Sequence, residues 1–266
     1  MKLVALVSAA KDPEAAVKVL TEAAGSTAAE ARMRLAPEPP ALLARLEDAQ
    51  ALELVATLRK AGLAALAVDA RVPSDADRLQ VRKFALRKDA LELEPRAGAA
   101  VALPWSELAL ILRAQRTKRS ETDRTETTRR LSIGSAVLTG GLKMTSTKTS
   151  VVRSAEEQAE QLLLLYAKDG SVFSLSESAL DWSGLGALQP SRTANFLELT
   201  KRIRERAPAA RYDERLVRLG RRSLPFGAKA EQRIATRDST TLHTDTAGTV
   251  DVLAELLWQA LAAALI

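Results

Sequence analysis

The residues best suited to chemistry are cations gathered between positions 201 and 222. We call these seven residues the arginine belt: Lys201, Arg202, Arg204, Arg206, Arg218, Arg221 and Arg222. Guanidinium and ammonium groups bind the phosphates of nucleic acids and of anionic membranes. Acidic residues interleave with them: Glu198, Glu205, Asp213 and Glu214. This interleaving is typical of an ordinary helix surface with i, i+4 pairs, so binding of an anionic partner is the alternative hypothesis.

Two further patterns have the residue types of a known chemistry without its spacing. In GSAVLTGGLKMT, Lys143 does not directly follow the last glycine, and Met144 stands where a phosphate-binding loop needs a hydroxyl. His243 has Asp238 and Asp245 nearby in a polar stretch, but catalytic triads are defined by geometry rather than by local clustering. We expect a loop at the first and a solvated histidine at the second.

RRLS at 129–132 places two arginines before a serine, as basophilic kinases prefer. Phosphorylation of Ser132 would add about two negative charges beside Arg129 and Arg130. We retain Ser132 as a candidate modification site.

Composition excludes several classes of site. The chain has no cysteine and a single histidine, which rules out disulfides, thiolate nucleophiles and clusters of histidine ligands. We expect no metal and no cofactor, and we favour a non-catalytic protein over an enzyme. The net charge of +6 permits an anionic partner without requiring one.

The apolar run at 3–7 is shorter than the core of a signal peptide, and no segment reaches the roughly 18 uncharged apolar residues of a spanning helix. We therefore expect a cytoplasmic protein. A length of 266 residues favours two domains.

The first seventy residues predict a compact sequence of elements. The run at 3–7 indicates a buried strand, and the next segment indicates a helix with Asp12 as N-cap and Gly25 as its end. A second helix follows, capped by Ser26 or by Thr27.

The remainder of this region completes the pattern. Pro39 and Pro40 prevent further helix, so 41–46 is expected to be an edge strand. A third helix is predicted at 51–62 and a closing strand at 63–70, which gives the order β-α-α-β-α-β.

This order, together with AAVKVLTEAAG, the AEAR helix, AP before a short strand and ALELVATLRKAG, resembles the C-terminal domain of the bacterial ribosomal stalk protein. Adaptors of the Clp protease share that fold. The resemblance implies a domain at 1–71, which we expect to fold alone. The stalk family's basic patch on its first helix is represented only by Lys18, because Pro13 and Thr21 replace cations, so the fold and not the ribosomal role is carried over.

A polar connection at 71–79 precedes a second predicted domain, 79–222. Its short runs alternate with period two, and 161–177 predicts a hairpin with Asp169-Gly170 as a type I′ turn. An amphipathic helix follows at 193–207. The tryptophan of VALPWSEL and the order of hairpin then helix resemble a pleckstrin-homology-like β barrel. A polar insertion at 116–158 interrupts it, and we expect this segment to be mobile.

The last segment, 223–266, is expected to be a polar linker followed by an apolar helix. Asp251, Glu255 and Gln259 form one thin polar stripe on that helix. Packing into its own core is favoured, and a homo-oligomer through 250–266 is left open.

The sequence therefore predicts an α+β protein: a small β-α-α-β-α-β domain, then an antiparallel pleckstrin-homology-like β barrel with a C-terminal amphipathic helix. We expect a non-catalytic protein-interaction or adaptor protein whose partner is unidentified. The alternative is binding of nucleic acid or an anionic membrane surface by the arginine belt.

Overall fold

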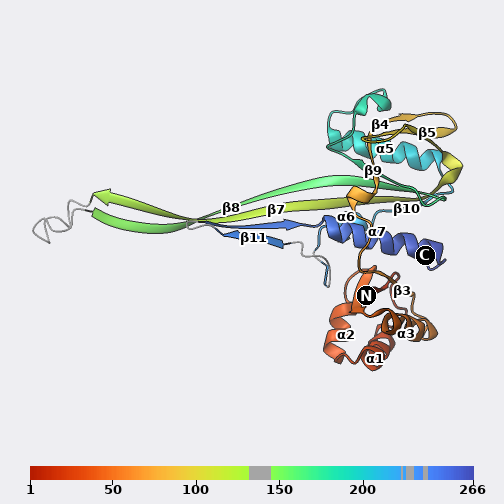
Figure 1. The fold of residues 1–266 in the computed structure, drawn as a ribbon, viewed down its shortest axis with the longest axis horizontal. Coiled ribbons are helices and arrows are strands. Elements are labelled where there is room, and N and C mark those ends of the chain that lie inside the picture. Colours follow the sequence, from red (N-terminus) through yellow and green to blue (C-terminus); the bar gives the residue numbers. More distant parts are fainter. Residues whose placement is uncertain (132–144, 223, 226–230, 236–238) are drawn as a thin grey trace, which may run out of the picture. The chain divides into compact units, whose positions relative to one another are not determined.

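The computed structural model describes residues 1–131, 145–222, 224–225, 231–235 and 239–266. These residues form a mixed α+β structure with a small antiparallel sheet and a large open sheet (Figure 1). They divide into two compact units, the first made of residues 1–116, 159–228 and 246–266 and the second of 117–158 and 229–245. The domain boundaries predicted at 71, 79 and 222 stay predictions.

The small sheet has the predicted order of elements. Its strands are β1 (Lys2–Leu6), β2 (Ala41–Leu46) and β3 (Ala65–Asp69), arranged β2-β1-β3 with both pairs antiparallel. β2 lies at an edge, as expected of a strand that directly follows two prolines.

Three helices pack on one face of this sheet: α1 (Pro13–Ala24), α2 (Ala28–Leu35) and α3 (Asp48–Lys60). The Asp12 carboxylate caps α1, and Gly25 ends it at φ +61°, a conformation that glycine adopts without strain. Thr27, rather than Ser26, caps α2 in a capping box with Glu30.

The large sheet also lies partly in the first unit. Its further strands are β4 (Leu79–Leu86), β5 (Ala90–Pro95), β6 (Val101–Pro104), β7 (Leu108–Leu131), β8 (Thr145–Ala167) and β9 (Val172–Ser176). In this unit their order is β7-β8-β9-β4-β5-β6, and β10 (Arg211–Asp213) pairs in parallel with β7. The sheet is open, so the closed barrel that we expected is not confirmed. Three short 3-10 helices lie in the connections of the described residues: η1 (Asp75–Asp77) before β4, η2 (Trp105–Glu107) before β7 and η3 (Trp182–Leu185) before α5.

The predicted hairpin is confirmed, with Tyr166 opposite Val172 across β8 and β9. Its turn differs from the prediction. Gly170 has φ +89°, but Asp169 has no positive φ, which a type I′ turn would require. The Ala167 amide instead bonds the Ser171 carbonyl at 2.9 Å, which closes a three-residue loop.

Opposite faces of the large sheet bury different helices. α5 (Arg192–Arg206) packs on one face through Phe196, Leu199 and Ile203, as its periodicity predicted. Along β8, Leu163 and Leu165 belong to this core. Their alternating neighbours Leu162, Leu164 and Tyr166 belong to a second core with α7 (Ala247–Ala262).

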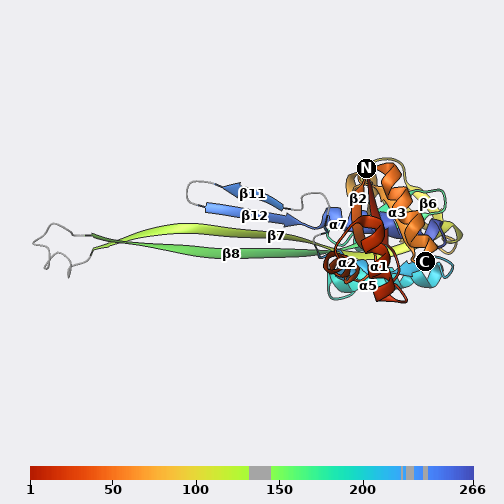
Figure 2. The same cartoon turned by 90° about the horizontal axis from the view of Figure 1, so that it is seen from below.

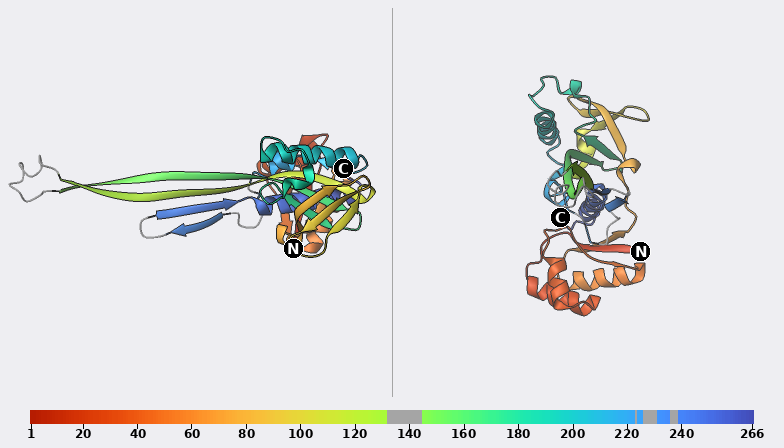
Figure 3. Two further views of the ribbon diagram at one scale, coloured as in Figure 1. Left: turned by 90° about the horizontal axis from the view of Figure 1, so that it is seen from above. Right: turned by 90° about the vertical axis from the view of Figure 1, so that its left-hand side faces the viewer.

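α7 lies between the two sheets (Figures 1 and 3). Leu3, Leu42 and Leu66 from the small sheet share one core with Leu253 and Leu257 of α7. The helix is therefore packed within its own chain, as favoured by its apolar surface. A homo-oligomer through 250–266 stays a prediction. The expectation that 1–71 folds alone assumed that few apolar side chains were left over, whereas apolar side chains from one face of its sheet share a core with α7.

The second unit is a sheet of the order β11-β12-β7-β8, with β11 (Glu231–Ala235) and β12 (Ser239–Asp245) (Figure 2). Strands thus occupy parts of the segment 116–158, which was expected to be a polar insertion, and of the polar linker expected at the start of 223–266. The expected mobility of 116–158 stays a prediction. Both are rich in threonine, a β-branched residue that favours strands, and pairing satisfies their backbone groups. The hydroxyl groups of Thr122 on β7 and Thr241 on β12 form a hydrogen bond, with their oxygens 3.1 Å apart.

His243 lies on β12, exposed, opposite Ser120 of β7 and Gln232 of β11. Ser132 and the stretch 134–144 lie outside the described residues. In the part of the chain that the structure describes, no helix has the length and hydropathy needed to cross a membrane. The same residues contain no group of acids and histidine placed to hold a metal ion.

Candidate binding groove and arginine belt

The α5 members of the arginine belt differ in how they are held. Arg202 pairs with Glu198 at 2.7 Å and donates to the Leu185 carbonyl at 2.9 Å, so it fixes α5 to η3. Lys201 is exposed, with its Nζ 3.9 Å from Glu205. Arg202 is therefore structural, and Lys201 is more available to a ligand.

Arg204 and Arg206 lie over aromatic rings. The Arg204 guanidinium carbon is 3.8 Å from the centre of the Tyr212 ring, and that of Arg206 is 5.8 Å from the Trp105 ring. Tyr212 is oriented by its hydroxyl, which donates to Glu214 at 2.8 Å. Burial, and then the bond to Glu214, raise the pKa of Tyr212. The tyrosine therefore stays protonated and holds Arg204 by a cation–π contact.

Two belt cations line a cavity of about 400 Å³ at the end of α5. Its lining is Lys201, Arg204, Glu205, Ala207, Pro208, Ala210 and Tyr212. The cavity has the cations and the concave shape that a small anion requires, with one competing carboxylate.

The remaining belt residues lie on or just after α6 (Leu216–Leu219). Arg218 binds both carboxylate oxygens of Glu38, at 2.6 and 3.3 Å. Arg221 and Arg222 are exposed. The structure thus divides the belt into a set on α5 and a set around α6, with Arg218 already engaged.

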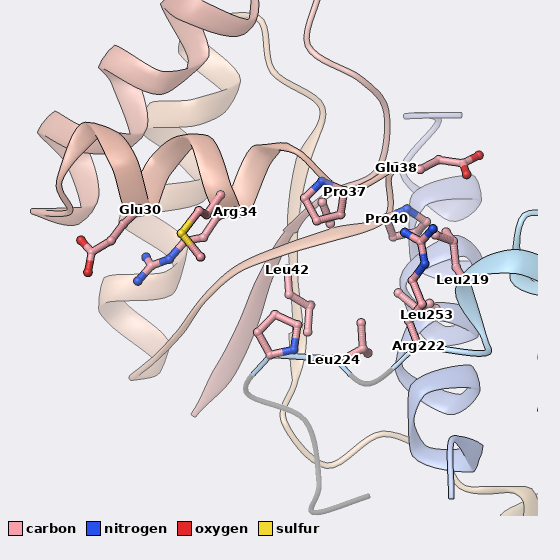
Figure 4. A pocket seen from close by; sticks show the side chains of 13 residues that line it. Glu30, Arg34, Pro37, Glu38, Pro40, Leu42, Leu219, Arg222, Leu224 and Leu253 are labelled. Atoms are coloured by element: carbon pink, nitrogen blue, oxygen red, sulfur yellow. The ribbon is translucent and has the colours of Figure 1, made fainter. Parts of the chain in front are cut away.

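Around α6 the structure forms an apolar groove of about 390 Å³ that the sequence analysis missed. We define the groove by its lining: Glu30, Met33, Arg34, Pro37, Glu38, Pro40, Ala41, Leu42, Leu219, Arg222, Leu224, Pro225 and Leu253 (Figure 4). These residues come from α2, the segment between α2 and β2, the start of β2, α6 with the segment after it, and α7, so only the folded first unit assembles the groove.

The floor of the groove is fixed and one wall is adaptable. Leu42, Leu219 and Leu253 are buried, so the surrounding core sets their positions. Met33 of α2 is 76% exposed, and its unbranched thioether side chain can adjust to a ligand. Exposed Pro37 and buried Pro40 add apolar lining without backbone N–H groups.

The acidic residues at the groove already have partners. Backbone and hydroxyl hydrogen bonds from Thr27 hold the Glu30 carboxylate and lower its pKa. Glu38 is bound by Arg218, as described above. Arg222 makes no ion pair with any described residue, so its charge is not neutralised within the groove.

A separate polar cluster lies within the first unit. Arg116 pairs with Asp75 at 3.0 Å and with Glu160 at 2.7 Å. Glu160 also accepts from the hydroxyls of Ser176 and Ser178. Every group in the cluster is engaged by another, which is typical of a structural network rather than of a waiting catalytic site.

Comparison with protein-family models, with curated proteins and with solved structures finds no match for this chain. The resemblances to the stalk domain and to pleckstrin-homology domains stay predictions.

Proposed function

We propose that this chain is a non-catalytic protein-interaction module and that the apolar groove binds an apolar segment of a partner protein. The observation that carries the proposal is the floor of buried leucines beside Met33, which is 76% exposed. Most large apolar side chains of this unit are buried, so an exposed one beside an apolar groove is an uncommon combination.

Filling the groove would be favourable for a simple physical reason. Apolar surface removed from water contributes about 25 cal/mol per Å², and anchoring side chains in preformed pockets carry most of the energy of an interface. The leucine floor is rigid before binding, which reduces the cost of ordering.

The expected folds fit this proposal. The resemblance of residues 1–71 to the stalk domain, a fold shared with adaptors of the Clp protease, is consistent with a binding module. The pleckstrin-homology-like reading is retained as an architecture of strands followed by α5 packed on one sheet face. Both readings favour an adaptor over an enzyme.

The test is quantitative affinity purification from the native cell with two matched variants. Met33→Glu places a charge in the groove, and Leu52→Glu changes another exposed apolar side chain, on α3, outside the groove. We expect a partner that is retained by the wild type and by Leu52→Glu and lost with Met33→Glu. Equal recovery with all three proteins would show that the groove is not the binding surface.

A second candidate function is binding of nucleic acid or an anionic membrane by the α5 part of the belt. It is favoured by the cavity lined by Lys201, Arg204 and Tyr212. The double variant Lys201→Gln/Arg204→Gln should then elute earlier from heparin, and Lys83→Gln/Lys88→Gln serves as the charge-matched control. Binding of the wild type to single-stranded DNA or to anionic vesicles then shows whether the partner is nucleic acid or a membrane. Equal elution of both double variants would remove this function.

A further inference from the structure

We infer that the partner segment in the groove carries a carboxylate beside its apolar side chains, and that Arg222 binds this carboxylate. This inference rests on the proposed function, because it specifies the chemistry of the segment that fills the groove.

The charges around the groove favour an acidic occupant. The two lining carboxylates are engaged, Glu30 by Thr27 and Glu38 by Arg218. Arg222, which lines the same groove, has no acidic partner among the described residues. An acidic group on the ligand would therefore meet an uncompensated cation, whereas a lysine or arginine would meet repulsion without a free acid to bind.

The backbone of Arg222 is held in place. Its N–H donates to the Leu219 carbonyl at 3.1 Å, and its carbonyl accepts from the Thr249 hydroxyl at 2.8 Å. Since Leu219 lines the floor and Thr249 belongs to α7, the core that forms the groove also positions Arg222. Figure 4 shows its side chain with those of Leu224 and Leu253 around the groove. The guanidinium fork can bind a carboxylate through two parallel hydrogen bonds.

A polypeptide fits better than a small apolar anion. Met33 lines the groove and is 76% exposed, so part of the apolar lining is open to solvent on the surface of α2. Adaptable methionine at the edge of an apolar groove is typical of surfaces that bind varied peptide side chains. We therefore assign the occupant as an apolar segment with a nearby aspartate, glutamate or C-terminal carboxylate.

The experiment selects displayed random peptides on the full-length protein and removes those that also bind Met33→Glu. The survivors are sequenced, and their affinities are measured for the wild type, Arg222→Glu and Arg221→Glu. Arg221 is the matched control, because it is an exposed neighbouring arginine that does not line the groove. Thermal melts establish that each variant is folded.

We expect the survivors to combine leucine-like residues with an acidic group. Arg222→Glu should lower the affinity of the selected peptides about 10-fold to 100-fold, as expected for loss of a charged hydrogen bond. Arg221→Glu should lower it by much less. A second selection on Arg222→Glu should enrich lysine or arginine instead.

The outcomes separate the inference from the proposed function. The role of Arg222 would be overturned if the groove-dependent peptides were not enriched in acidic residues. It would also be overturned if Arg222→Glu and Arg221→Glu lowered the peptide affinity equally. In either case the groove would still be a peptide site. Failure to select any groove-dependent peptide would overturn both. Sodium dodecanoate binding, or a dimer that Met33→Glu dissociates, would instead identify a lipid or a second copy as the occupant.

Discussion

The guanidinium of Arg78 and the carboxylate of Asp251 form a buried ion pair, with only 3% and 10% of their side chains exposed. Arg78 also donates to the Pro73 carbonyl at 3.1 Å. Burial raises the pKa of Asp251, and the charge of Arg78 opposes this rise. The pair therefore joins the connection before β4 to α7, and little of either side chain is open to solvent.

Removing one member of this pair should be much worse than removing both. Asp251→Leu leaves the Arg78 charge buried alone, so we expect the free energy of unfolding to fall by about 3–5 kcal/mol. Arg78→Met/Asp251→Leu should recover most of that loss. Urea unfolding of the single and double variants measures the coupling free energy between the two residues. A double variant whose loss of stability equals the sum of the two single losses would contradict the expectation.

Acid should weaken the Arg116 cluster through Glu160. Burial would raise the pKa of Glu160, but the hydrogen bonds from Ser176, Ser178 and Arg116 together lower it below the ordinary value of 4.5. A lowered folded-state pKa gives stability that is complete above the ordinary value and is lost as pH falls through the folded value. The melting temperature of the wild type should therefore decline below pH 4.5 more steeply than that of Glu160→Gln. Exposed Glu53→Gln is the control and should follow the wild type.

Trp258 should stabilise the chain without setting its association state. Its ring stacks on Tyr166 of β8, with centroids 5.1 Å apart and planes at 24°. Trp258→Ala should cost about 3 kcal/mol, and Trp258→Phe should restore part of it. Sedimentation should give the same mass for all three proteins. A change of mass with an unchanged melt would place this residue at an interface between copies.

Gly184 should not tolerate a side chain. An added Cβ would lie 1.8 Å from the carbonyl oxygen of Phe84 on β4, and backbone cannot move aside as a flexible side chain does. Gly184→Ala should therefore lower the free energy of unfolding by about 1–3 kcal/mol. Ser183→Ala, an exposed neighbour, should be nearly neutral. Equal melts for the two variants would show that η3 can shift away from β4 at no cost.

Local signals predicted the elements of the first seventy residues because each boundary has a chemical marker in the sequence. Asp12 begins a helix, Gly25 ends it, and Pro40 precedes an edge strand. The partner of the sheet's second face has no such marker. Leu3 and Leu42 read as ordinary core residues of a small domain, whereas α7, far along the chain, is what covers them.

The long strands were missed for a different reason. The segments around 117–158 and 231–245 lack apolar alternation, so period-two reasoning does not detect them. Their pairing is carried by backbone hydrogen bonds between polar segments, which leave no hydrophobic pattern.

The groove escaped prediction because its parts are distant in sequence. Met33 and Leu42 lie in one region, and Leu219 and Leu253 in two others. The belt was predicted by residue type, but type alone could not distinguish engaged Arg218 and Arg202 from Arg222 and Arg204. Only the positions of Glu38 and Glu198 make that distinction.

The placement of α7 between two sheets has a consequence for folding order. The small sheet comes before α7 in the chain and ends at Asp69, yet α7, which covers one of its apolar faces, begins only at Ala247, and Leu3 and Leu253 belong to one core. Contacts of such long sequence separation slow folding, because loop-closure entropy is lost before they form. A nascent chain would therefore expose an apolar sheet face until α7 has been synthesised. Such a face is prone to aggregation, so we expect chaperones to bind the incomplete chain.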